Sequence, residues 1–372
     1  MVLRKKARQI LRWALSGIGV LLAALAVSAL LPMRIAFPVP KPGPAADYAV
    51  ARAEIEGNIA GAPSTLSEAG HPRAFLHEQP TENVFVLLHG LTNYPEQFDK
   101  LGRLLFERGH NVVIPVTPGH GKADVMTDQL RNFTTEAMLG AANRAVTLSR
   151  GLGRRITVVG LSINGASAAW IAQNRTDVDR AVLLAPFLSP HGLPQWANAP
   201  LSRLLVRMPN IFLWWDPMHK ADLSGPSDAY PRFSTRSIGA TMLLGVDVLE
   251  ASGKSAPACG SILIVTTASD VAANNAATAR LAANWRERRP GAVATYEFPK
   301  AEGVPHDFID PSQPSQRVDL VYPRLIEMLE KKDSLPCAKR ASFPAFNKPP
   351  GSPGGWHPPR VPTGLRWYRA AA

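Results

Sequence analysis

The chain has 372 residues and the composition of a globular α/β protein, which excludes a largely disordered chain and allows one large domain with appendages. The formal net charge of +12 comes from the two ends: residues 1–41 carry seven Lys or Arg, residues 334–372 carry six, and neither segment has an acidic residue. The remaining 28 basic residues of the body are balanced by 29 acidic ones, so no nucleic-acid partner is expected.

The first predicted element is a membrane helix within residues 1–34, preceded by a basic cytoplasmic segment. No charged residue occurs from Trp13 to Leu31, and 19 residues of helix extend about 28 Å, close to the thickness of a hydrocarbon core. Five basic residues precede this run, which predicts a cytoplasmic N-terminus and an exported, periplasm-like body. The alternative is a signal peptide cleaved near 24–26 or 27–29, which would give a secreted protein.

Residues 35–80 connect this helix to the folded domain. The stretch from Ile35 to Pro44 is rich in proline and lacks an apolar period. It predicts an extended spacer that lifts the domain off the bilayer.

A regular alternation of strands and helices follows. Short β-branched runs alternate with segments of helical length, which predicts an α/β fold with a doubly wound, mostly parallel sheet. The functional site of such a sheet lies at the carboxyl ends of its strands. The first part of this core is residues 81–185, with strands expected at 83–89, 111–116, 156–159 and 179–185 and helices ending near 108 and 150.

A serine follows the strand at 156–159. That strand stops at Gly160, Ser162 comes two residues later, and small helix-forming residues begin at Gly165. This order predicts a sharp strand-to-helix turn that exposes the serine hydroxyl above the N–H groups of the next helix, where an oxyanion is stabilised. The alternative is an ordinary helix N-cap, so the other members of a catalytic constellation must decide.

Residues 186–260 interrupt the alternation. This segment contains many prolines, the aromatic residues Phe212, Trp214 and Trp215, and a helical stretch from Thr235 to Leu249. The core resumes at residues 261–333, with strands expected at 261–267 and 292–298 and helices at about 274–288 and 316–332.

Two further polar residues lie after strands of this second part. Asp270 follows the strand at 261–267, and His306 lies in the loop after the next strand. An imidazole accepts a serine proton and returns it near neutral pH, and a carboxylate orients that imidazole. Asp307 and Asp310 are competing carboxylates, but only Asp270 directly follows a strand.

The order Ser162, Asp270, His306, together with the loop His89-Gly90, resembles the α/β-hydrolase superfamily over about residues 83–332. The nearest groups are the monoacylglycerol lipases, carboxylesterases and serine-aminopeptidase-like hydrolases. One departure is Asn164, which stands where the G-x-S-x-G pattern has its second glycine.

The resemblance implies a nucleophile elbow at Ser162, with His306 as base and Asp270 as its orienting carboxylate. The backbone N–H groups of Leu91 and Ile163 would form the oxyanion hole. Residues 186–260 would be a cap that lines an acyl pocket, the substrate a small-molecule ester with a lipid-like acyl chain, and no cofactor would be needed.

Other functions remain open. A peptidase or amidase would use the same triad, and a non-catalytic binding protein on this fold is compatible with Asn164. An aspartate-nucleophile dehalogenase or epoxide hydrolase is disfavoured because Ser162 occupies the elbow. Two further histidines, His89 and His120, are expected to be structural.

The two cysteines are Cys259, before the strand at 261–267, and Cys337, after the final helix. Both positions belong to the lower rim of the sheet, so a disulfide is one expectation and two unrelated thiols the other. No metal-ligand spacing is present, so no metal is expected. Residues 334–372, rich in Pro and Gly, predict a disordered basic tail.

Overall fold

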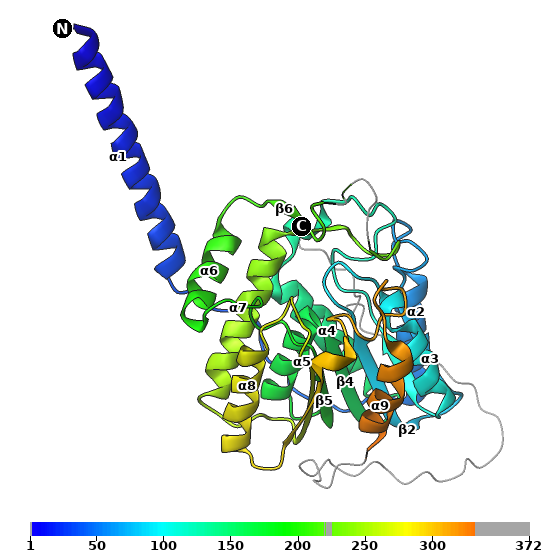
Figure 1. Cartoon of the computed structure of the whole chain (residues 1–372). Helices are drawn as coiled ribbons and strands as arrows, with labels where there is room; N and C mark the ends of the chain where they lie inside the picture. Colours follow the sequence, from blue (N-terminus) through cyan, green and yellow to red (C-terminus); the bar gives the residue numbers. More distant parts are fainter. Residues whose placement is uncertain (1, 219, 221–224, 332–372) are drawn as a thin grey trace, which may run out of the picture.

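The body of the protein is built on one sheet (Figure 1). The computed structural model describes residues 2–218, 220 and 225–331. Within these residues a seven-stranded sheet has the order β1-β3-β2-β4-β5-β8-β9. All neighbouring strands are parallel except β1 and β3, which confirms the mostly parallel sheet. The strands are β1 (Arg73–Phe75), β2 (Thr81–Leu88), β3 (Asn111–Ile114), β4 (Gly153–Leu161), β5 (Arg180–Leu184), β8 (Ser261–Thr267) and β9 (Val293–Phe298).

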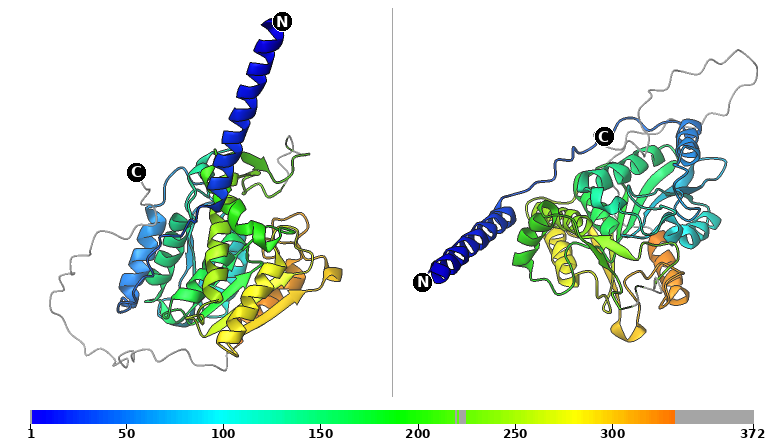
Figure 2. Two further views of the ribbon diagram at one scale, coloured as in Figure 1. Left: turned by 90° about the vertical axis from the view of Figure 1, so that its left-hand side faces the viewer. Right: turned by 90° about the horizontal axis from the view of Figure 1, so that it is seen from above.

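Helices cover both faces of this sheet (Figure 2). Successive side chains of a strand point to opposite faces, so in β4 Ile156 and Val158 enter one core cluster while Val159 and Leu161 enter the other. The first cluster includes residues of α2 (Tyr48–Ala60), α4 (Thr135–Ser149), α5 (Ile163–Asn174), α7 (Thr235–Ser252) and α8 (Asn275–Arg288). The second includes residues of α3 (Asp99–Glu107) and α9 (Val318–Glu330).

The connecting segment at 35–80 begins with the proline-rich stretch expected to be an extended spacer. Residues 32–47 contain no helix or strand, and the ring of Phe37 packs edge-on against Trp170 of α5, with ring centroids 5.4 Å apart. The segment also contains α2 and β1, which the proline-rich start of the segment did not indicate. This apolar contact holds the segment against the body rather than away from it.

Residues 186–260 divide into two parts. Helix α6 (Gln195–Arg207) and the antiparallel pair β6 (Phe212–Trp214) and β7 (Arg232–Ser234) form the first part. Helix α7 belongs to the body, because its buried apolar residues join the first core cluster. Gly245 permits this close packing, since a Cβ there would lie 2.1 Å from the carbonyl oxygen of Leu188. We use "cap" for α6 and the β6–β7 hairpin.

An N-terminal helix, α1 (Val2–Leu30), extends away from the body (Figure 1). Its Arg12–Leu30 portion is long and apolar enough to cross a membrane, as a signal sequence would also be. Its carboxyl end contacts α6: Arg203 donates to the carbonyl oxygen of Leu30 at 3.4 Å and Arg207 to that of Leu31 at 3.0 Å. The carbonyl oxygen of Ser28 also accepts from Arg207. These guanidinium groups satisfy carbonyls that have no partner within the helix.

The predicted cysteine pair is only half described. Cys259 is buried before β8, and its Sγ donates to the carbonyl oxygen of Ser261 at 3.2 Å. Cys337 and the predicted tail at 334–372 lie outside the described residues. The disulfide therefore stays a prediction.

Candidate functional site

Ser162 occupies the sharp turn between β4 and α5. Its φ is 55° and its ψ is −115°, a strained backbone conformation for a residue with a side chain. A Cβ at Gly160 would lie 1.9 Å from the carbonyl oxygen of Asn164, and one at Gly165 would lie 2.7 Å from Cα of Pro186. Both glycines are therefore required by close backbone packing, including the one displaced by a position from the expected pattern.

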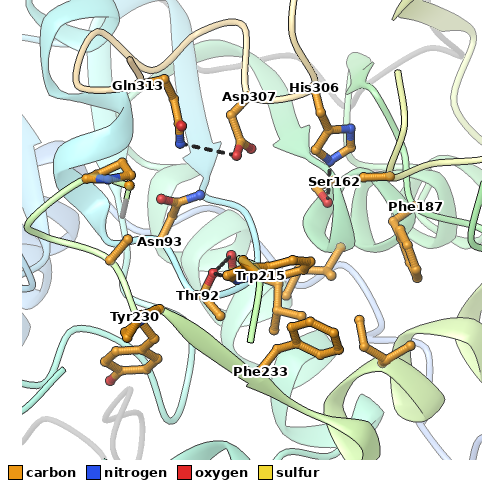
Figure 3. Close-up of a pocket in the computed structure, with 18 of the residues that line it drawn as sticks. Thr92, Asn93, Ser162, Phe187, Trp215, Tyr230, Phe233, His306, Asp307 and Gln313 are labelled. Carbon is orange, nitrogen blue, oxygen red and sulfur yellow. Dashed lines mark hydrogen bonds between the residues drawn. The ribbon is translucent and has the colours of Figure 1, made fainter. Parts of the chain in front are cut away.

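The structure brings Ser162, His306 and Asp270 together at the carboxyl edge of the sheet (Figure 3). His306 Nε2 lies 2.9 Å from Ser162 Oγ, and His306 Nδ1 lies 2.7 Å from Asp270 Oδ2. The other carboxylate oxygen of Asp270 accepts the backbone N–H groups of Ala272 and Ala273, each at 2.8 Å. The carboxylate is thus fixed on one side by its own loop and presented to the imidazole on the other.

The charges of this group support one another. Burial by itself raises the pKa of Asp270, but the hydrogen bond and charge of His306, with the two loop N–H groups, hold that pKa below its ordinary value. Burial by itself lowers the pKa of His306, but the hydrogen bond and charge of Asp270 raise it above its ordinary value. The arrangement therefore stabilises an imidazolium beside Ser162, which a proton transfer from the hydroxyl requires.

Asn164 has a structural role that explains its place in the elbow. Its side chain is buried, and Nδ2 donates to the carbonyl oxygen of His89 at 2.7 Å and to Thr117 Oγ1 at 3.0 Å. A glycine there could make neither bond. The amide therefore joins the start of α5 to the loops after β2 and β3.

We predict that Asn164→Gly, although it restores the expected pattern, lowers the free energy of unfolding by about 2 kcal/mol or more. The reason is that it leaves a buried carbonyl and hydroxyl without this partner. Urea unfolding measures the loss. Asn174→Gly is the matched control, because Asn174 lies on the same helix and donates only to the half-buried carbonyl of Trp170. Equal stability of wild type and Asn164→Gly would contradict the assigned role.

Leu91 and Ile163, the expected oxyanion donors, both line the cavity that contains Ser162. Ile163 is the first residue of α5, where backbone N–H groups lack an intrahelical acceptor. Leu91 lies in the loop after β2. His89 fixes this loop: His89 Nδ1 lies 2.9 Å from the carbonyl oxygen of Gly90, and His89 Nε2 accepts from the N–H of Thr117 at 3.0 Å.

His89 and His120 are buried near this loop with their rings 5.2 Å apart. Burial lowers the pKa of His89 to about 3, with a contribution from His120, and lowers that of His120 to about 4. Both rings are therefore neutral near pH 7, as a structural role requires.

A cavity of about 850 Å³ adjoins the serine. Its apolar wall includes Phe187, Trp215, Phe233 and Ile238, so the cap contributes to the site.

Of the aromatic cluster noted in the sequence, only Trp215 lines the cavity. The guanidinium of Arg232 instead lies over the ring of Phe212, 4.5 Å from the centroid of that ring. The ammonium of Lys220 lies over the ring of Trp214.

The cap also contacts the loop that contains Leu91. Trp215 Nε1 donates to Thr92 Oγ1 at 2.9 Å, and the N–H of Tyr230 donates to the carbonyl oxygen of Thr92 at 2.8 Å. Thr92 has a φ of 64°, which is unfavourable for a β-branched residue. Nothing local in the sequence indicated these two contacts, because Trp215 and Tyr230 lie more than a hundred positions from Thr92.

The cavity also has a polar side, formed by Asn93, Asp307 and Gln313 (Figure 3). The competing carboxylate Asp307 thus lies in the cavity wall, whereas Asp310 is buried and accepts from the N–H and hydroxyl of Ser312. Among the residues that the structure describes, no group of three or more His, Cys, Asp or Glu could hold a metal ion.

Comparison with known proteins agrees with this architecture. Residues 83–225 match the family model described as the alpha/beta hydrolase fold. A solved structure of the metagenome-derived lipolytic enzymes LipS and LipT is 15% identical, with a TM-score of 0.51 over 72% of this chain and 100% of that one. The monoacylglycerol lipase of Paleococcus ferrophilus is 20% identical, with a TM-score of 0.53 over 70% of this chain and 97% of that one. Such identities show the fold alone, and a search of curated proteins gives no match.

Proposed function

We propose that this chain, which has the α/β-hydrolase fold, is a serine hydrolase that cleaves carboxylic esters through an acyl-enzyme. The observation that carries the proposal is the continuous set of hydrogen bonds from Ser162 through His306 to Asp270 at the strand ends. Nothing in this chemistry requires a cofactor.

In the proposed reaction Ser162 Oγ attacks the ester carbonyl while His306 Nε2 accepts the hydroxyl proton. Asp270 holds the proton on Nδ1 and stabilises the imidazolium. The developing oxyanion accepts hydrogen bonds from the N–H groups of Leu91 and Ile163, and one such donor is worth roughly 3 kcal/mol of transition-state stabilisation. His306 then returns the proton to the leaving alcohol, and water repeats the sequence to release the acid.

The apolar wall of the cavity supports a substrate with an apolar acyl group. Trp215, Phe233 and Ile238 present hydrocarbon surface near Ser162, where burial of each methylene of a chain is worth about 0.8 kcal/mol. The two structural neighbours are named as lipolytic enzymes, which is consistent with this substrate class.

A fluorophosphonate probe tests the proposal directly, because it forms a covalent bond only with an activated serine. Wild type is expected to be labelled and Ser162→Ala not. Absence of labelling in wild type, or equal labelling of both, would contradict the proposal. Parallel assays with p-nitrophenyl acyl esters and aminoacyl anilides separate an esterase from an amidase with the same triad.

We also propose that α1 is an uncleaved membrane anchor and that the body lies on the exported side. The Arg12–Leu30 helix has the length and hydropathy of a membrane span, which supports this proposal. The basic residues before it support a cytoplasmic N-terminus.

The expected result is that the full chain sediments with membranes, resists extraction by carbonate, and begins at its encoded N-terminus. Deletion of residues 2–30 should release the body into the soluble fraction with its fluorophosphonate labelling retained. Sequencing of a mature soluble product that begins near Leu30 would contradict the anchor and favour a cleaved signal peptide.

A further inference from the structure

The polar side of the cavity contains a carboxylate that the proposed reaction does not use. Asp307 faces the cavity beside His306, and Gln313 Nε2 donates to its Oδ2 at 3.3 Å (Figure 3). Asn93 also lines this part of the cavity. The amide of Gln313 is neutral, so it stabilises the negative charge of Asp307 without neutralising it.

Among the described residues, His306 can offset the charge of Asp307 when it is protonated, but no Lys or Arg does so. No Lys or Arg is among the cavity-lining residues within the described part of the chain. Nor does an ion pair between Asp307 and a Lys or Arg occur in the described ranges. Behind it, Asp310 Oδ2 shares the same amide of Gln313 at 3.4 Å, which brings a second carboxylate close. Burial raises the pKa of Asp307, the charge of His306 lowers it, and the charges of Asp310 and Asp270 raise it, so that this pKa lies above its ordinary value.

We propose that Asp307 is a binding residue for a positively charged ammonium group of the substrate. A cation at this position would neutralise a partly buried carboxylate, and hydrogen bonds to charged groups are stronger than those between neutral groups. A primary ammonium is favoured because it donates up to three hydrogen bonds and accepts none, which suits a site whose own N–H donors already bind the carboxylate.

The position of Asp307 defines the substrate class further. Figure 3 shows Asp307 on one side of Ser162 and the apolar ring of Phe187 on the other. An ester bound across Ser162 would therefore place an ammonium-bearing group on one side of the scissile bond and an apolar group on the other. This inference rests on the proposed ester hydrolysis and adds a charge requirement to it.

The test compares matched esters that differ only in charge. For the acyl side the pair is p-nitrophenyl 6-aminohexanoate and p-nitrophenyl heptanoate. For the alcohol side the set is 2-aminoethyl, 2-hydroxyethyl and propyl octanoate. We expect kcat/KM of wild type to favour the ammonium ester of at least one set by about 10- to 100-fold, and Asp307→Asn to lose that preference. Glu287→Gln, which removes an exposed charge on α8, should keep the wild-type ratio.

Three results would overturn the inference. One is a wild type that hydrolyses charged and neutral esters equally well, which would leave the proposed hydrolase function intact. Another is a preference that survives Asp307→Asn. The third is a fall in kcat/KM of Asp307→Asn for the 2-hydroxyethyl ester alone, which would assign the polar side of the cavity to hydroxyl groups.

Two measurements keep the test independent of folding. Fluorophosphonate labelling of Asp307→Asn reports whether Ser162 and His306 remain assembled. In wild type, hexylammonium should inhibit hydrolysis of the neutral ester at about tenfold lower concentration than hexanol, and equal inhibition would contradict an ammonium site. Loss of both ester hydrolysis and labelling in wild type would instead refute the proposed function itself.

Discussion

A Ser162→Ala variant is expected to lose about six orders of magnitude in kcat for ester hydrolysis, because the residue supplies the nucleophile of every turnover. His306 and Asp270 act through that hydroxyl, so a second substitution at His306 should add little to the loss. Any residual rate over water would come from the N–H groups of Leu91 and Ile163 and from substrate binding.

The measurement is single-turnover hydrolysis of a p-nitrophenyl ester at high enzyme concentration. Ser167→Ala is the matched control, since Ser167 is a buried serine of the same helix outside the cavity lining. It should keep kcat within a few-fold of wild type. A Ser162→Ala variant with more than a hundredth of wild-type kcat would show that another residue is the nucleophile.

Asp270→Asn is expected to lower kcat by about 10⁴ while leaving the loop in place. Asparagine can still accept the N–H groups of Ala272 and Ala273, but it cannot supply the negative charge that stabilises the imidazolium of His306. It also permits the tautomer of His306 whose proton lies on Nε2, which cannot accept a proton from Ser162.

The same variant should change the pH dependence of kcat/KM. Activity requires the neutral imidazole, so it is lost as the pH falls through the pKa of His306. Asp270 raises that pKa, and wild type should therefore reach half-maximal kcat/KM above about pH 6.5, the ordinary value for histidine. Asp270→Asn removes the raising charge, so the midpoint should move to lower pH.

Asp307→Asn provides the comparison for Asp270→Asn, because Asp307 also lies next to His306 and also raises its pKa. If Asp307→Asn rather than Asp270→Asn produced the 10⁴-fold loss, the orienting carboxylate would be Asp307. The hydrogen bond of 2.7 Å between Asp270 Oδ2 and His306 Nδ1 favours Asp270.

Local patterns in the sequence determined the sheet, its mostly parallel direction and the order of its main elements. The β-branched run before Gly160 and the small residues after it specify a strand, a turn and a helix, because backbone sterics act over a few residues. Each of Ser162, Asp270 and His306 comes after a strand in the sequence, and the carboxyl ends of parallel strands meet at one edge of a sheet. The sequence therefore predicted that these three residues lie at the same edge.

Only the tertiary structure decided how the site is held and what lines it. The partners of Asn164 are 75 and 47 residues away, and Trp215 is 123 residues from Thr92, so no local period records these bonds. The charge environment of Asp307 likewise depends on which side chains several distant loops bring to the cavity. Periodicity specifies which face of an element is buried, whereas side-chain partners depend on the packing of all the elements together.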